Sequence, residues 1–127
     1  IAGSSAWFDR GFVTYSNAAK SDMLGVAETT LARHGAVSEA TARAMAQGAL
    51  KHSLADWTLA ITGIAGPSGG SPDKPVGTVC FAWASRDGGC EAQTRFFSGD
   101  RAAVREQSVR HALNGLLARI DAATEVA

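Results

Sequence analysis

The first residues that could do chemistry are a lysine and the polar residues just before it. Tyr15, Ser16, Asn17 and Lys20 lie within one short segment. Ser16 and Lys20 are four residues apart, so they share a face if a helix begins early in this segment. A lysine held near a hydroxyl in a dry cleft can lose its proton and act as a base. The alternative is a capping serine and a surface lysine, and the spacing alone favours this alternative.

A glycine-rich segment, residues 63–75, is the second candidate. It follows a run that we predict to be a buried strand, and α/β sheets bind ligands at such strand ends. Its glycines let backbone N–H groups turn toward an anion without a Cβ in the way, while its prolines keep the rest stiff. A plain surface loop is an equal alternative. A Walker loop is excluded because Gly-Lys-Ser/Thr is absent.

Other polar residues indicate less. His34, His52 and His111 fall in separate predicted helices without the spacing of metal ligands, so we expect no metal site. Arg101 and Arg105 are one turn apart at the start of a predicted helix. They are placed to meet a phosphate, but a solvated helix face is the favoured interpretation.

Two cysteines flank a predicted hairpin turn at residues 86–89. If Ser85 faces Cys90, then Cys80 faces Arg95, and the strand between them separates the two cysteines by ~16 Å. This distance exceeds the reach of a disulfide bond. We therefore expect reduced structural thiols, which suits a cytoplasmic protein.

Composition restricts the class of protein. A chain of 127 residues with 46% hydrophobic and 19% charged residues is expected to form one globular domain. No apolar run reaches the roughly 18 residues that span a membrane, and no signal peptide is recognised. We therefore expect a cytoplasmic protein without a membrane partner. The formal net charge is zero and the Lys and Arg residues are scattered, which argues against nucleic-acid binding.

The elements that would position these residues begin with a short strand. Residues 11–15 are rich in β-formers, and Ser16 or Asn17 can cap a following helix that ends at Gly25. A second short helix is expected over residues 28–34. These helices would place the lysine segment immediately after the strand.

A longer helix and a second strand follow. The helix is expected from a cap at Ser38 to about Ser53. Residues 57–62 are apolar apart from threonine, which is typical of a strand buried on both faces, as in a parallel sheet. With the first strand, these elements predict a right-handed βαβ crossover.

The last third of the chain predicts a hairpin and a helix. Residues 76–84 and 90–97 form the expected antiparallel hairpin, and Ser98 or Asp100 caps the final helix. Apolar residues recur along that helix at intervals of three and four, which predicts one apolar stripe against the sheet: Val109, Leu113, Leu116 and Ile120. The pattern as a whole predicts a single α/β domain with a mixed sheet.

Five motifs occur in order along the chain: Gly-Phe-Val-Thr-Tyr-Ser-Asn-Ala-Ala-Lys (11–20), His-Gly-Ala-Val-Ser (34–38), Thr-Gly-Ile-Ala-Gly-Pro (62–67), Lys-Pro-Val-Gly-Thr-Val (74–79) and Ser-Gly-Asp-Arg (98–101). This set resembles the bacterial CinA C-terminal domain family over nearly the whole chain. The resemblance is closest to the stand-alone enterobacterial-type deamidase, which lacks the amino-terminal molybdopterin-binding-like domain of full CinA.

The resemblance implies a three-layer α/β/α fold with a mixed sheet. It also implies hydrolysis of nicotinamide mononucleotide to nicotinate mononucleotide and ammonia, without a cofactor. Together with apolar residues such as Trp7, Phe8 and Trp83 on short elements, it predicts a homo-oligomer.

The resemblance also assigns site residues. Lys20 matches the lysine thought to act in catalysis, and Tyr15 lies beside it. Thr62 and the glycines after it match the loop that lines the substrate pocket. The residues expected to bind substrate are Ser16, Asn17, Thr62, Gly63, Gly66, Gly69, Gly70 and Ser71.

One departure from the family pattern affects the expected activity. Family members carry an earlier strand and helix, joined by a Glu-Ser-Cys-Thr-Gly-Gly motif whose serine is the expected nucleophile or the close partner of the lysine. This motif is absent from residues 1–127, so we expect the first strand and helix of the domain to be missing. A ligand-binding or regulatory module, or an inactive structural fragment, is therefore the alternative to an amide hydrolase.

Overall fold

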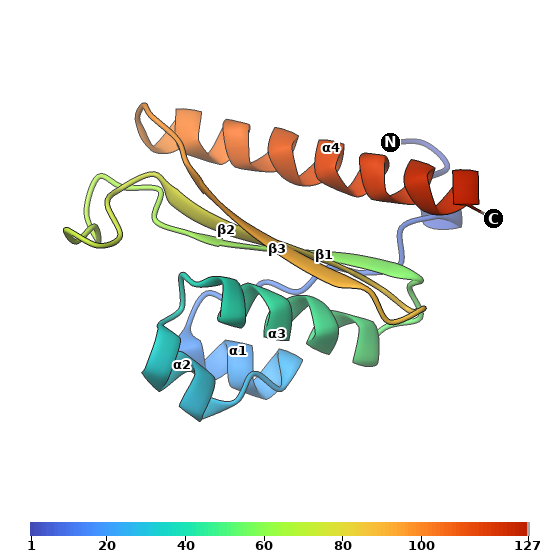
Figure 1. The fold of residues 1–127 in the computed structure, drawn as a ribbon, viewed down its shortest axis with the longest axis horizontal. Coiled ribbons are helices and arrows are strands. Elements are labelled where there is room, and N and C mark those ends of the chain that lie inside the picture. Colours follow the sequence, from blue (N-terminus) through green and yellow to red (C-terminus); the bar gives the residue numbers. More distant parts are fainter. Residues whose placement is uncertain (127) are drawn as a thin grey trace.

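The computed structural model describes residues 1–126 as one sheet between two layers of helices (Figure 1). Helices α1–α3 cover one face of the sheet, and the long helix α4 covers the other. The predicted three-layer α/β/α architecture is confirmed. The helices are α1 (Asn17–Leu24), α2 (Glu28–His34), α3 (Glu39–Lys51) and α4 (Arg101–Val126), and the strands are β1 (Trp57–Gly63), β2 (Thr78–Ser85) and β3 (Cys90–Phe96), after a 3-10 turn η1 (Ser4–Ala6).

The described strands pair only in antiparallel fashion, in the order β1-β2-β3. The expectation of a parallel strand over residues 11–15, and of a βαβ crossover, is wrong. Residues 8–15 form no strand within the described chain, because no other strand lies beside them to make a ladder. Val13 and Tyr15 are accordingly 80% and 87% exposed.

The strand buried on both faces is β2 and not β1. β2 lies in the middle of the sheet, whereas β1 lies at an edge and leaves Ile61 36% exposed. The apolar composition of residues 57–62 suggested a central strand, but α4 covers the edge strand incompletely. Composition alone does not separate a central strand from a half-covered edge strand.

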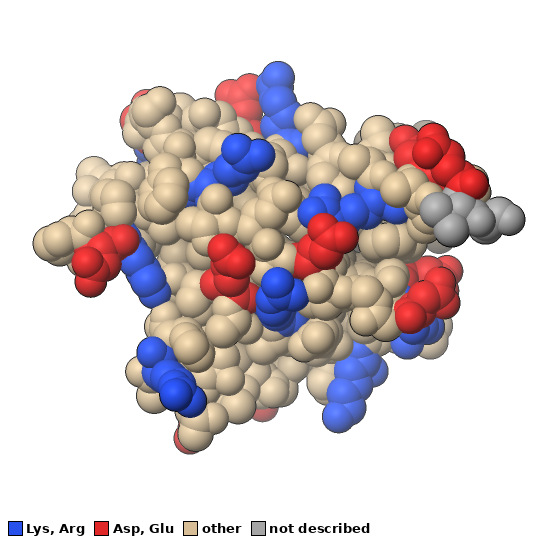
Figure 2. Space-filling view, in the orientation of Figure 1, with Lys and Arg blue, Asp and Glu red and all other residues tan. Residues whose placement is uncertain are grey.

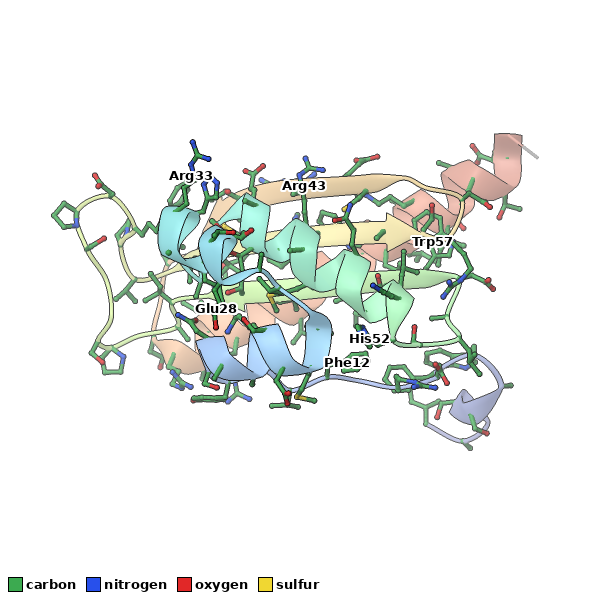
Figure 3. The ribbon with its side chains drawn as sticks, turned by 90° about the horizontal axis from the view of Figure 1, so that it is seen from below. Phe12, Glu28, Arg33, Arg43, His52 and Trp57 are labelled. Atoms are coloured by element: carbon green, nitrogen blue, oxygen red, sulfur yellow. The ribbon has the colours of Figure 1, made fainter. Side chains whose placement is uncertain are left out.

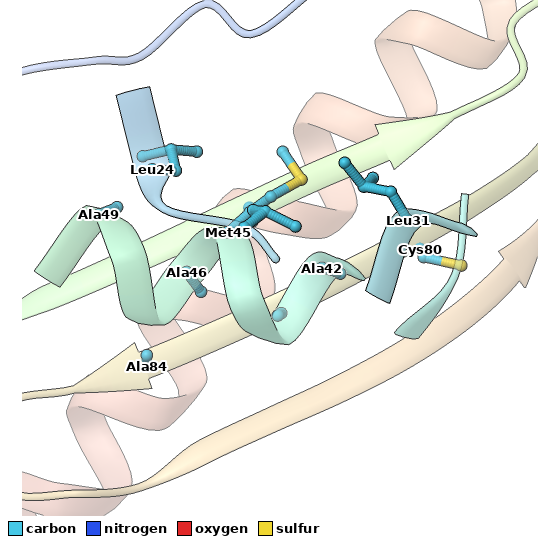
Figure 4. Packing of buried hydrophobic residues seen from close by; sticks show 11 residues of the cluster. Leu24, Leu31, Ala42, Met45, Ala46, Ala49, Cys80 and Ala84 are labelled. Carbon is cyan, nitrogen blue, oxygen red and sulfur yellow. The ribbon is translucent and has the colours of Figure 1, made fainter. Parts of the chain in front are cut away.

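Small side chains fill the layer between the sheet and α3 (Figure 4). Alanines of α3 face small residues of β2, so the helix lies close to the strand: Ala42, Ala46 and Ala49 against Cys80, Ala82 and Ala84. α1 crosses α3 at Gly48, where an added Cβ would fall 2.0 Å from the Leu24 carbonyl oxygen. This contact requires glycine and fixes the position of α1.

Large side chains fill the layer between the sheet and α4. Phe81 and Trp83 of β2 are fully buried and stack with ring centroids 5.9 Å apart. The Trp83 indole N–H donates to the carbonyl of Ala112 at 3.0 Å. An added Cβ at Gly115 would fall 2.4 Å from the Trp83 ring, so α4 lies directly on this side chain.

The face that α4 turns to the sheet differs from the predicted stripe. Val104, Ser108 and Ala112 are the buried residues of this helix. Leu116 packs against this core as predicted, and Ile120 is half-buried. Val109 and Leu113 are 53% and 56% exposed, so the expectation that these two residues pack against the sheet is wrong. The physical reason is that Trp83 and Phe81 need small partners on the helix, and the small residues lie on a neighbouring face.

The capping predictions are confirmed. The hydroxyl of Ser16 accepts from the Ala19 N–H at 3.0 Å, and that of Ser38 accepts from the Thr41 N–H at 3.1 Å. Of the two candidates for the last helix, Asp100 makes the cap through its carboxylate.

The hairpin register is shifted by one residue from the expected pairing. Cys80 faces Thr94, and Cys90 faces Ala84. The shift arises because the Ser85 N–H donates to the carbonyl of Gly89, which closes a shorter turn than expected. Both thiols are free, as predicted, and the offset along β3 still separates them by ~13 Å.

Charged side chains of both signs alternate over the face shown in Figure 2, without a broad region of one sign. In residues 1–126, no helix is both long enough and apolar enough to cross a membrane.

His111 is a titratable group in the aromatic layer under α4. Its ring lies 4.6 Å from that of Phe81, and its Nε2 pairs with the Gln93 side-chain oxygen at 2.9 Å. Burial lowers the pKa of His111, and the charges of Arg95 and Arg119 lower it further. The folded protein therefore favours the neutral imidazole.

We predict that the free energy of unfolding falls as the pH drops from about 7.5 to about 5.5, because the unfolded chain then takes up a proton that folded His111 resists. Urea denaturation at the two pH values measures the loss. His111→Gln should reduce it, whereas the same change at the exposed His34 should not. An unchanged pH dependence in His111→Gln would contradict this role.

Candidate functional site

Lys20 is a buried lysine on the first turns of α1, with only 6% of its surface exposed. Its ammonium nitrogen Nζ donates to the backbone carbonyl of Thr14 at 2.9 Å. The extended segment before α1 therefore provides the recorded partner of this side chain. The alternative of a surface lysine is wrong, because α1 packs closely against α3 and Lys20 lies on the side of α1 that this packing buries.

Burial lowers the pKa of Lys20. An ammonium group loses solvation when it is buried, so the neutral amine becomes more accessible. A neutral amine can accept a proton, which is what a general base does. Burial therefore shifts the pKa of Lys20 in the direction that base chemistry requires.

The neighbours of Lys20 in sequence are placed differently. Tyr15 is 87% exposed, so its ring extends into solvent. The Ser16 hydroxyl accepts the Ala19 N–H as a helix cap, and the structure records no bond between it and Lys20 within residues 1–126. Asn17 is the one of these residues that lines a pocket.

That pocket is open and has a volume of about 390 Å³. It lies between α1 and α2, on the helical face shown in Figure 3, where Glu28 is labelled. The volume is at the lower end of the range for small-molecule sites. Its lining combines one carboxylate with amide, hydroxyl and apolar groups: Asn17, Ala18, Ser21, Glu28, Leu31 and Ala32.

The glycine-rich loop extends beyond the sheet on the same side as α2 (Figure 1). Gly66 and Gly69 adopt positive φ angles of 83° and 97°, which glycine tolerates without strain. Ser71 and Lys74 close a tight turn, since the Ser71 N–H donates to the Lys74 carbonyl at 2.9 Å and the Ser71 hydroxyl accepts the Lys74 N–H at 3.1 Å. The loop is thus an ordered structure with its own hydrogen bonds.

Close packing fixes the two ends of the loop. An added Cβ at Gly63 would lie 2.9 Å from a Val79 methyl group, and one at Gly70 would lie 2.7 Å from the Val76 backbone nitrogen. Gly63 therefore allows β1 to lie close to β2, and Gly70 allows two parts of the loop to lie close together.

The Thr62 hydroxyl donates to the carbonyl of Ala36 at 2.7 Å. Thr62 is 7% exposed and lies at the end of β1, so its hydroxyl is engaged with the backbone between α2 and α3. The structure brings Thr62 to the loop between α2 and α3, and does not place it in the pocket beside Asn17.

Two polar contacts of the glycine-rich loop were missed by the sequence interpretation. The Arg101 guanidinium donates to the Gly66 carbonyl at 3.2 Å, and the Lys74 ammonium donates to the His34 carbonyl at 2.8 Å. Arg101 is exposed, as a solvated helix face predicts, and it makes this contact in addition. Both residues belong to motifs that resemble the family. The motifs marked these residues as candidates but did not predict which groups they would contact.

A second, smaller pocket of about 220 Å³ lies between β1 and α4. It is lined by apolar residues and by Arg105 and Ser108. Among residues 1–126, no group of three or more His, Cys, Asp or Glu side chains is arranged to hold a metal ion.

The sequence model of the CinA C-terminal domain matches residues 1–120. The chain belongs to the CinA C-terminal domain family. The match covers α1–α3, the sheet and most of α4, so the whole site described above lies within the CinA C-terminal domain.

Curated members of the CinA family are similar to this chain along most of its length. The nicotinamide-nucleotide amidohydrolase PncC of Escherichia coli is 60% identical over 116 residues, which are 91% of this chain and 70% of that protein. The protein of the same name from Enterobacter agglomerans is 56% identical over 117 residues, 92% of this chain and 71% of that protein.

Solved structures of the CinA family share the fold. The competence/damage inducible protein CihA from Agrobacterium tumefaciens superposes with a TM-score of 0.90 at 53% identity, over 93% of this chain and 72% of that one. A CinA superfamily protein from Klebsiella pneumoniae superposes with a TM-score of 0.87 at 46% identity, over 91% of this chain and 72% of that one.

Proposed function

We propose that this chain is the greater part of an amide hydrolase domain that converts nicotinamide mononucleotide and water to nicotinate mononucleotide and ammonia. The observation that carries the proposal is the 60% identity, over 91% of the chain, to a relative named nicotinamide-nucleotide amidohydrolase. The buried amine of Lys20, in the same segment as the pocket residue Asn17, supports it.

Lys20 is proposed as the general base. Burial lowers its pKa, which makes the neutral amine easier to reach, and the bond to the Thr14 carbonyl holds its Nζ in one place. The amine would take the proton of a hydroxyl nucleophile as that oxygen attacks the amide carbon, and the proton would pass to the departing ammonia, which leaves an ester on the nucleophile. Water, activated by the same amine, would then attack the ester carbon. The proton would return to the oxygen of the nucleophile as nicotinate mononucleotide leaves. Tyr15 is proposed to act beside it, which requires its exposed ring to turn toward the substrate.

The nucleophile is proposed to be the serine of the Glu-Ser-Cys-Thr-Gly-Gly motif that family members carry before this region. Ser16 is engaged as a helix cap, which supports a hydroxyl from elsewhere. The substrate is proposed to lie against Ser16 and Asn17 and to extend to Thr62, whose hydroxyl would then have to exchange the Ala36 carbonyl for the substrate. The loop residues Gly63, Gly66, Gly69, Gly70 and Ser71 are proposed to line the bound substrate. The Ser71 N–H already donates to the Lys74 carbonyl, so the anionic groups of the substrate are proposed to meet the N–H groups of the glycines.

A non-catalytic nucleotide-binding module is the second candidate. It is favoured by the absence, within residues 1–126, of any recorded hydroxyl bonded to Lys20 Nζ. Ammonia release from nicotinamide mononucleotide separates the two candidates. We predict slow or no release by residues 1–127 alone and clear release by a form that also carries the family's first strand and helix. Equal specific activity of the two forms would show that the expected serine is dispensable.

For the extended form, we predict that Lys20→Ala lowers the turnover rate at least ~10²-fold, because general acid–base catalysis contributes ~10²- to 10⁴-fold. Because burial lowers the pKa of Lys20, the activity of the unchanged enzyme should rise with pH before an ordinary lysine would titrate. Lys51→Ala, at an exposed lysine of α3, is the matched control. Near-normal kinetics in a folded Lys20→Ala variant would exclude the role.

We also propose that the protein works in the cytoplasm as a homo-oligomer. The two free thiols, too far apart to pair, support a reducing compartment. One side of α4 leaves Val109, Leu113 and Leu117 more than half exposed, and Trp7 is 69% exposed, which supports association. We predict a mass above that of one chain in light scattering. A monomer at high concentration would contradict the association.

A further inference from the structure

Three consecutive carbonyl groups, from the last residue of α2 into the turn before α3, accept hydrogen bonds from side chains. The carbonyl of His34 accepts from the Lys74 ammonium, and that of Gly35 accepts from the hydroxyl of Thr41 at 2.7 Å. The carbonyl of Ala36 accepts from the Thr62 hydroxyl. The glycine-rich loop, α3 and β1 thus meet at one short turn.

Lys74 differs from the other two donors because it comes from a loop that is otherwise exposed. Residues 67–73 are all exposed, whereas Lys74 is half-buried. Its ammonium reaches the last carbonyl of α2, where the partial negative charge of the helix end lies. A single charge-assisted hydrogen bond therefore joins the outer part of the loop to the helical layer.

The turn is shaped to admit this ammonium. Gly35 has a φ angle of 79°, and an added Cβ there would lie 3.3 Å from Lys74 Nζ. A side chain at this position would therefore crowd the ammonium as well as strain the backbone. Glycine at position 35 therefore leaves room for the contact between Lys74 and the His34 carbonyl.

We propose that Lys74 is a positioning residue for substrate binding, which holds the glycine-rich loop against the end of α2. α2 also provides Glu28, Leu31 and Ala32 to the pocket beside α1. Through Lys74, the loop and this pocket wall keep a fixed relation, so the loop is in place before the substrate arrives. The inference rests on the proposed function for its substrate, but the contact itself can be tested without turnover.

The first experiment measures amide hydrogen exchange in this chain. Lys74→Met removes the charge and keeps a long apolar side chain, and Lys74→Arg keeps a donor. We expect Lys74→Met to speed exchange roughly tenfold in peptides covering residues 64–77 and 33–38. Lys74→Arg should restore most of the protection. Lys51→Met, at an exposed lysine outside the loop, is the control and should change neither peptide.

The second experiment measures kinetics in the extended form. We expect Lys74→Met to raise KM for nicotinamide mononucleotide roughly tenfold, with a much smaller change in kcat, because the loop must then be ordered during binding. A roughly tenfold fall in kcat with an unchanged KM would overturn the positioning role. If no form hydrolyses this substrate, the proposed function fails, and the exchange experiment still decides the contact. Unchanged exchange in Lys74→Met, or failure of Lys74→Arg to restore it, would overturn the inference.

Discussion

The two faces of β2 set the spacing of every other element. Toward α3 this strand presents Cys80, Ala82 and Ala84, and toward α4 it presents Val79, Phe81 and Trp83. A face of small side chains lets a helix approach closely, whereas a face of large rings keeps a helix at a distance and requires small residues on it. The alternation of side chains along one strand therefore determines that α3 and α4 pack in different ways.

The close approach of α3 to the sheet also sets the positions of α1 and of the turn at residues 34–38. Gly48 of α3 lets α1 cross at the Leu24 backbone, and this crossing buries Lys20. The start of α3 places the turn at residues 34–38 within reach of Thr62 and of the glycine-rich loop. A buried ammonium with one recorded acceptor is costly in solvation, and the packing of α1 on α3 must offset that cost.

Local elements were predictable from the sequence because their determinants are local. Ser16, Ser38 and Asp100 are caps whose partners lie three residues away, and the three short helices were found with nearly the right bounds. Features that depend on distant residues were not predictable in the same way. The strand expected at residues 11–15 has no neighbour to pair with. The stripe predicted on α4 is right at Leu116 and wrong at Val109 and Leu113, because the size of Trp83 decides which residues of α4 face the sheet.

In the candidate site, too, local features were predictable and contacts with distant residues were not. Residue types located the lysine and the glycine-rich loop, since a base and an anion cradle have recognisable compositions. They did not distinguish a side chain that contacts a ligand from one that holds the backbone. Thr62, Arg101 and Lys74 each donate to a carbonyl group that the sequence does not identify. These three donors hold the turn and the loop in place. Burial lowers the pKa of Lys20, and Asn17 of the same helix lines the pocket, so the proposed chemistry depends on Lys20.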